Sequence, residues 1–250
     1  MDKGKLTDDQ RASAFERLTF STDLATAVVD ADLVIEAVLQ KLDVKRGLFA
    51  DLDRLCPPHT ILASNCSSLM PSQLADATGR PDQFVNLHFF NPALIMRCVE
   101  VVRGPATGEQ TQAAAVAFVH CIGKEPVVLK KEIPGFVANR ILYAVRDEAI
   151  SLLEGGVAEV ADIDRACQTA LGCPMGPFEL MDLTGLGIGY HVKKARLDLT
   201  GDPRDQPQRS LAESGRLGRK TGHGWYRYDE HGTRDEHDST AEHDKTAEGI

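Results

Sequence analysis

The chain has 250 residues, 42% of them hydrophobic, and a formal net charge of −9. This length can bury a substantial core in one or two domains, and the sequence has no basic stripe of the kind that nucleic-acid binding requires. No stretch is apolar over the roughly 18 residues that a membrane-spanning helix needs, so we expect a soluble protein with no membrane contact.

The six cysteines contain no C-x-x-C pair and lie mostly inside apolar segments. This pattern is typical of buried, reduced thiols, because disulfides rarely persist in reducing compartments. We therefore expect a cytoplasmic protein.

Strand-like and helix-like segments alternate through the first half of the chain. Short apolar runs predict strands at 30–38, 59–65, 84–90, 98–104 and 125–130. Apolar periodicity and boundary residues predict helices at 6–18, 42–55, 71–78 and 109–122. Such alternation indicates βαβ units, so we predict an α/β fold with an open parallel sheet.

After Lys131 the sequence predicts helices only. Pro134 suits the start of a helix and Gly155-Gly156 its end. We therefore predict an α/β domain over 1–132, an all-α domain over 133–229 and a disordered acidic tail over 230–250. The tail contains His231, His237 and His243, which we interpret as part of a solvated segment and not as metal ligands.

Polar residues follow two predicted strands at their carboxyl ends, where ligands bind in open α/β sheets. Residues 65–68 follow one strand, and His88 with Asn91 ends the next. Histidine exchanges protons near neutral pH, which contributes about 100- to 10,000-fold to a reaction rate. Glu100 can hydrogen-bond one ring nitrogen and favour the imidazolium. The pair alone is weak support for catalysis, since a histidine and a glutamate twelve residues apart often have a structural role.

Six ordered motifs strengthen this hypothesis. They are S-N-x-S-S-L (64–69), L-H-F-F-N-P (87–92), V-E-V (99–101), P-G-F-x-x-N-R (134–140), P-M-G-P-F-E-L (174–180) and G-R-K-T-G-x-G-W-Y (218–226). Together they closely resemble the 3-hydroxyacyl-CoA dehydrogenases of fatty-acid β-oxidation and their 3-hydroxybutyryl-CoA relatives. The resemblance implies a Rossmann-type NAD-binding domain followed by a helical domain that supports a homodimer. It also implies oxidation of the L-3-hydroxyl of an acyl-CoA to a ketone, with hydride passed to NAD.

The same resemblance implies roles for individual residues. His88 corresponds to the catalytic base and Glu100 to the carboxylate that orients it. Ser67 and Asn139 correspond to residues that hydrogen-bond the reacting oxygen and the substrate, with Ser67 also near the nicotinamide. The remaining matched positions imply contacts with the cofactor for Asn91 and Lys220 and with the CoA moiety for Lys5.

The chain departs from the family at three places. Gln40 stands where the family usually has a glutamate near the nicotinamide ribose, so we expect weakened binding there, and Cys66 replaces a threonine. No strand is followed by a G-x-G-x-x-G turn; the glycines at 185, 187 and 189 lie in the helical part, and residues 218–221 imitate only part of a phosphate-binding loop. We therefore expect an N-terminally truncated Rossmann sheet, a gene start upstream of Met1, and an exposed edge on strand 30–38.

Three functions stay open at this point. The first is the NAD-dependent dehydrogenase, with activity in doubt without the glycine-rich turn. The second is an inactive binding or dimerisation module derived from it. The third is a related hydroxyacid or sugar-acid dehydrogenase, although the wording of the motifs at 88–92 and 174–180 favours acyl-CoA.

Overall fold

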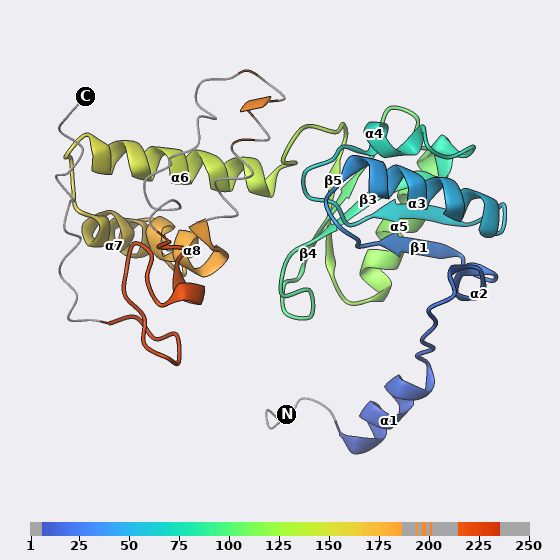
Figure 1. Ribbon diagram of the computed structural model, residues 1–250, viewed down its shortest axis with the longest axis horizontal. Coiled ribbons are helices and arrows are strands. Elements are labelled where there is room, and N and C mark those ends of the chain that lie inside the picture. The colour runs from blue at the N-terminus through green and yellow to red at the C-terminus, as the bar shows by residue number, and fades with distance from the viewer. Residues whose placement is uncertain (1–6, 187–193, 195–196, 199–200, 202–214, 236–250) are drawn as a thin grey trace. The chain divides into compact units, whose positions relative to one another are not determined.

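The computed structural model describes residues 7–186, 194, 197, 198, 201 and 215–235 (Figure 1). The chain divides into two compact units, residues 1–136 and 137–250.

The first unit is built on a five-stranded sheet whose spatial order follows the sequence. Its strands are β1 (Leu33–Glu36), β2 (Ile61–Ser64), β3 (Phe84–Phe89), β4 (Cys98–Val102) and β5 (Glu125–Leu129). The strands β1, β2 and β3 are parallel, β4 runs antiparallel to β3, and β5 is parallel to β4. Among the described strands, β1 pairs with β2 alone and forms one edge of the sheet.

The predicted α/β fold with an open, mainly parallel sheet is confirmed, and the one departure from parallel pairing is the step from β3 to β4. Only residues 90–97 connect these two strands. A parallel crossover needs about a dozen residues or more, whereas an antiparallel pair can be joined by a short loop. The short connection therefore reverses the chain direction.

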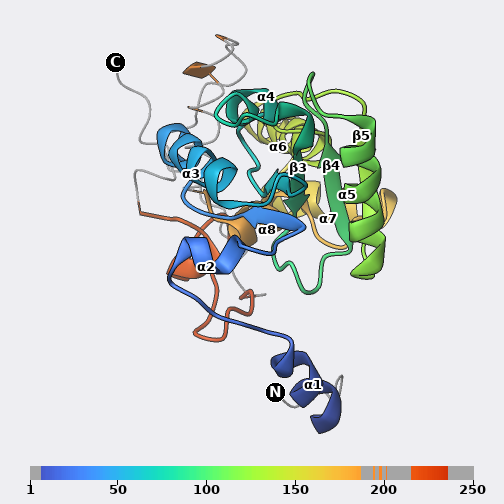
Figure 2. The same ribbon diagram turned by 90° about the vertical axis from the view of Figure 1, so that its right-hand side faces the viewer.

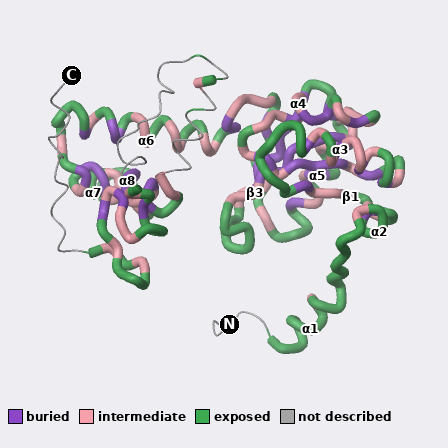
Figure 3. The backbone as a smooth tube through the Cα atoms, in the orientation of Figure 1, coloured by how far each residue is buried: buried purple, intermediate pink, exposed green. Residues whose placement is uncertain are grey.

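Helices cover both faces of the sheet (Figure 2). On one face α3 (Leu42–Leu55) and α4 (Pro71–Ala75) pack through Phe49, Leu52 and Leu74 against Leu62 and Phe84. On the other face α5 (Glu109–Cys121) packs against apolar side chains of β2, β3 and β4. Figure 3 shows the buried residues concentrated along the sheet and the inner sides of these helices.

Two further helices precede the sheet, α1 (Asp8–Glu16) and α2 (Leu24–Val28), and a short 3-10 turn, η1 (Pro81–Gln83), leads into β3. The side chain of Thr7 caps α1 by accepting the backbone N–H of Gln10. No residue of α1 is buried, so this helix depends on its cap and not on an apolar face.

The second unit consists of α6 (Ala138–Glu154), α7 (Val160–Ala170), α8 (Pro177–Thr184), the 3-10 turn η3 (Arg219–Thr221) and the loops around them. Its core contains Ile150 and Leu153 of α6, Ile163 of α7, Phe178 of α8 and Tyr226. Residues 230–235, which begin the predicted tail, form a turn in which Asp235 N–H donates to Arg227 O. Residues 236–250 lie outside the described part, as do Gly187 and Gly189.

Two buried aspartates hold the second unit together. Asp164 accepts the backbone N–H groups of Phe178 and Glu179, at 2.8 and 3.0 Å, and the hydroxyl of Tyr226 at 2.9 Å. It therefore caps the N-terminus of α8 from α7. Asp182 of α8 in turn accepts the backbone N–H groups of residues 225 and 226 and the hydroxyl of Tyr228. These bonds connect α7, α8 and the segment after η3.

In the described part of the chain, no helix is both long enough and apolar enough to cross a membrane.

Candidate active site

His88 and Glu100 face each other across β3 and β4. The strand register places them directly opposite, and Nδ1 of His88 lies 2.7 Å from Oε2 of Glu100. Both are buried, with 5% and 1% of their surface exposed. Because β3 and β4 are antiparallel, His88 and Glu100 are in direct contact although they are 12 residues apart in the sequence.

The contact with Glu100 determines which ring nitrogen of His88 carries the proton. An ionised carboxylate only accepts hydrogen bonds, so the neutral ring of His88 carries its proton on Nδ1 and donates it to Glu100. The other ring nitrogen, Nε2, then has the free electron pair and can take a proton from a substrate. When it does so, the negative charge of Glu100 stabilises the resulting imidazolium.

Aromatic rings surround His88. The ring centroid of Phe90 lies 4.5 Å from that of the imidazole, and the centroid of Phe136 lies 5.6 Å away. Phe136 reaches this position from a left-handed backbone turn, with φ of 78° at Gly135 and 48° at Phe136. These rings exclude water, which strengthens the electrostatic interaction between His88 and Glu100.

The loop after β2 lies beside this pair. The side-chain oxygen of Asn65 accepts the backbone N–H of Phe89 at 2.9 Å, one residue beyond His88. Ser67 is half-buried in the same loop. Next to it, the thiol of Cys66 donates to the side-chain oxygen of Gln40, at 2.6 Å. The structure therefore brings Gln40, Ser67 and His88 to the carboxyl ends of three neighbouring strands.

The remaining predicted residues are Asn91, Asn139, Lys220 and Lys5. Asn91 is exposed at the start of the β3–β4 connection. Asn139 is half-buried in the first turn of α6, and Lys220 is exposed in η3, so both belong to the second unit. Lys5 lies outside the described residues.

A buried ion pair close to the site was missed at the sequence level. Lys45 of α3 donates to the carboxylate of Glu36 at the end of β1, and these residues are 0% and 3% exposed. The signal was present, because Lys45 precedes the buried Phe49 and Leu52 by four and seven residues and therefore shares their face of the helix. Glu36 is likewise the one charged residue of an otherwise apolar strand, at its carboxyl end.

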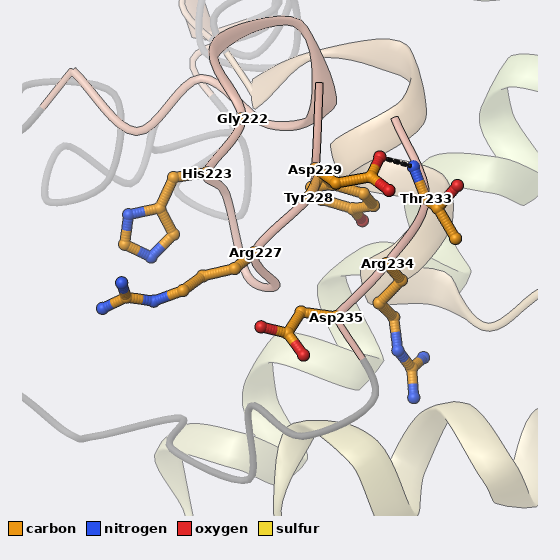
Figure 4. A pocket seen from close by; sticks show the side chains of 8 residues that line it. All are labelled: Gly222, His223, Arg227, Tyr228, Asp229, Thr233, Arg234 and Asp235. Atoms are coloured by element: carbon orange, nitrogen blue, oxygen red, sulfur yellow. Dashed lines mark hydrogen bonds between the residues drawn. The ribbon is translucent and has the colours of Figure 1, made fainter. Parts of the chain in front are cut away.

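An open pocket in the second unit does not include any predicted site residue (Figure 4). It is formed by residues 222, 223, 227–229 and 233–235. It is lined by two cationic side chains, Arg227 and Arg234, and by the carboxylates of Asp229 and Asp235, and Asp229 accepts the backbone N–H of Thr233 at 2.7 Å (Figure 4). The opposite charges balance, so the pocket has no clear preference for an ion of either sign.

Comparison with known proteins matches both units. The family model described as "3-hydroxyacyl-CoA dehydrogenase, NAD binding domain" matches residues 1–133, and that described as "3-hydroxyacyl-CoA dehydrogenase, C-terminal domain" matches residues 135–228. Human mitochondrial hydroxyacyl-coenzyme A dehydrogenase is 42% identical over 233 residues, which cover 90% of this chain and 72% of the human protein. A probable 3-hydroxybutyryl-CoA dehydrogenase of Bacillus subtilis is 39% identical over 232 residues, covering 92% of this chain and 80% of the relative.

Solved structures agree with these relatives. The (S)-3-hydroxybutyryl-CoA dehydrogenase PaaH1 from Ralstonia eutropha superposes with a TM-score of 0.84 at 37% identity, covering 90% of this chain and 80% of that one. The two family models, the relatives and the fold thus support the same family assignment as the buried His88–Glu100 pair. The chain belongs to the 3-hydroxyacyl-CoA dehydrogenase family.

Proposed function

We propose that this protein oxidises the L-3-hydroxyl of an acyl-CoA thioester to a ketone, in fatty-acid β-oxidation or in short-chain acyl-CoA metabolism. The observation that carries the proposal is the His88–Glu100 hydrogen bond of 2.7 Å. It provides a proton acceptor whose free nitrogen is defined and whose charged form is stabilised by a buried carboxylate.

The residues at the carboxyl ends of β1 and β2 fit the nicotinamide half of NAD. Gln40 offers an amide and Ser67 a hydroxyl, and these neutral groups suit ribose hydroxyls and a carboxamide. For the pyrophosphate, none of the described strands β1–β5 is followed by a glycine-rich G-x-G-x-x-G turn. When bound, NAD accepts the hydride that leaves C3 of the substrate.

In this mechanism Nε2 of His88 takes the proton of the substrate hydroxyl while Glu100 stabilises the imidazolium. Ser67 and Asn139 donate hydrogen bonds to the reacting oxygen and orient it. Their hydrogen bonds stabilise the charge that develops on that oxygen. We assign contacts with NAD to three further residues, Gln40, Asn91 and Lys220, and a contact with the CoA moiety to Lys5.

We assign NAD binding to residues 1–132 and the helical dehydrogenase domain to residues 133–229. The helical domain is also our candidate for a homodimer interface. Three apolar residues four apart, Val137 just before α6 and Ile141 and Val145 within it, are 40%, 60% and 44% exposed. A stripe of this kind can pack against a second copy, and replacement of Ile141 by Asp should then shift the sedimentation coefficient towards that of a monomer.

The six cysteines are all free thiols. We assign the protein to the cytoplasm, because a chain whose six cysteines form no disulfide is typical of a reducing compartment.

The test of the proposed reaction is oxidation of NADH with acetoacetyl-CoA, compared with His88→Gln. The variant should lower kcat by about 100- to 10,000-fold and leave NADH binding intact, because only the proton-transfer group is lost. His120→Gln, at an exposed position of α5, is the matched control and should be fully active.

Two other outcomes would decide between the alternatives. Absence of turnover together with absence of stabilisation by NAD would identify an inactive binding or dimerisation module. Turnover of a sugar acid or another hydroxyacid, with none of an acyl-CoA, would identify a related dehydrogenase. Equal activity of the parent and His88→Gln would refute the assigned role of His88.

A further inference from the structure

A row of polar residues crosses the sheet on the face that α3 and α4 cover. The register pairs Glu36 with Ser64 and Ser64 with Asn86, and pairs His88 with Glu100. Paired residues point to the same face, as do residues two apart in one strand, so Asn86 and His88 share a face. The same face otherwise carries apolar residues that pack under the two helices. The row therefore joins the Glu36–Lys45 ion pair to the candidate active site.

Glu36 stands at one end of this row and accepts hydrogen bonds from three groups. Its carboxylate accepts the ammonium of Lys45, the hydroxyl of Ser64 at 2.7 Å and the backbone N–H of Val38 at 2.6 Å. The bonds from Lys45 and Ser64 are shielded from water, because Glu36 is 3% and Ser64 1% exposed. Buried groups with several partners have few alternative arrangements, so their geometry is fixed.

Ser64 extends this fixed geometry into the loop that carries Ser67. Its hydroxyl oxygen donates to Glu36 and accepts the backbone N–H of Cys66, at 3.2 Å. On the other side, the amide of Asn86 donates to the backbone carbonyl of Cys66, at 2.8 Å. The peptide groups on both sides of Cys66 are thus held by buried side chains of neighbouring strands, and the next residue is Ser67.

We propose that Glu36, acting through Ser64, is a positioning residue that fixes the backbone of the Ser67 loop for the reaction. The proposal rests on the proposed function, in which Ser67 contacts the reacting oxygen and the nicotinamide. Glu36 touches neither substrate nor cofactor in this role. Lys45 balances its charge, so the ion pair forms an anchor from which the loop is held.

Ser64→Ala is the sharpest test, because it breaks the connection and leaves Glu36 its bonds to Lys45 and Val38. The matched control is Thr60→Val, one residue before the start of β2. Thr60 is 0% exposed and its hydroxyl donates to Ala31 O at 2.5 Å, so this variant also removes a buried hydroxyl bond. Both variants should lower the midpoint of thermal unfolding.

Only Ser64→Ala should lower kcat, by about 10- to 100-fold, because a small displacement of a group that contacts the reacting atoms is costly. It should also accelerate amide hydrogen exchange over residues 65–69, and Ser64→Thr, which restores a hydroxyl, should recover part of both losses. Equal effects of Ser64→Ala and Thr60→Val on kcat, or unchanged exchange in residues 65–69, would overturn the proposal.

The exchange measurement separates this proposal from the proposed function. If the parent protein does not turn over acetoacetyl-CoA, the proposed function fails. Faster exchange over residues 65–69 in Ser64→Ala alone would then still establish the anchor, and unchanged exchange would refute it.

Discussion

Glu100→Gln tests how the buried carboxylate contributes to catalysis. The substitution keeps the size and shape of the side chain but removes its negative charge. The side-chain oxygen of glutamine can still accept from Nδ1 of His88, so the orientation of the ring can persist. What is lost is the stabilisation of the imidazolium that forms when Nε2 takes the substrate proton.

The geometry of the His88–Glu100 hydrogen bond determines how far kcat should fall. The two atoms are 2.7 Å apart, which is the length expected of a charge-assisted hydrogen bond, and Glu100 is 1% exposed. Hydrogen bonds to charged groups contribute about 1.5–3 kcal/mol. At about 1.4 kcal/mol for each factor of ten, Glu100→Gln should lower kcat by about 10- to 150-fold. The KM for acetoacetyl-CoA should change little, because the carboxylate contacts the imidazole and not the substrate.

The assay is steady-state oxidation of NADH by the parent, Glu100→Gln, His88→Gln and the double variant. Since Glu100 acts through His88, the double variant should be no slower than His88→Gln alone. Circular dichroism and the unfolding midpoint show whether each variant is folded. If the losses in the two single variants multiply in the double variant, or if Glu100→Gln raises KM and leaves kcat unchanged, the assigned role of Glu100 is wrong.

Two further predictions concern stability. Burial first, and then the nearby carboxylates of Asp164 and Asp182, raise the pKa values of Tyr226 and Tyr228 respectively. Their contribution to the free energy of unfolding is therefore complete below the ordinary tyrosine pKa of about 10 and is lost as the pH rises above it. Denaturant unfolding as a function of pH should show this decline, and Tyr226→Phe should flatten it; a parent protein whose stability does not change in this alkaline range would refute the linkage. Gly176→Ala should destabilise the second unit by about 1–3 kcal/mol, since a Cβ atom there would lie 2.2 Å from Cγ of Asp164. Gly47 lies in the middle of α3, and a new Cβ there would have no atom within 4 Å. Gly47→Ala should therefore stabilise the protein by about 0.5–1 kcal/mol. Chemical denaturation measures the free energy of unfolding of both glycine variants, and changes of the same sign in the two would contradict this reasoning.

Local patterns in the sequence were sufficient for most elements. The helix predicted over 42–55 is observed as Leu42–Leu55, because its apolar spacing and the prolines at 57 and 58 define both its face and its end. The strand predicted over 84–90 is observed as Phe84–Phe89 for the similar reason that a short apolar run pairs on both sides. The candidate pair of His88 and Glu100 could also be chosen from chemistry and motifs alone. The helix and the strand depend on residues near one another in the chain, whereas the choice of the pair depended on motifs spread over residues 64–226.

Contacts between elements were decided only by the tertiary structure. Whether β4 runs parallel or antiparallel to β3 depends on how the chain closes over residues 90–97, and that direction places Glu100 opposite His88. The sequence placed Lys45 on the buried face of its helix and Glu36 in an apolar strand, but neither element identified the other as its partner, since a charge is buried only when another element supplies the opposite charge. The sequence by itself therefore determined which groups are available for the reaction, whereas the packing of separate elements decided which of them meet.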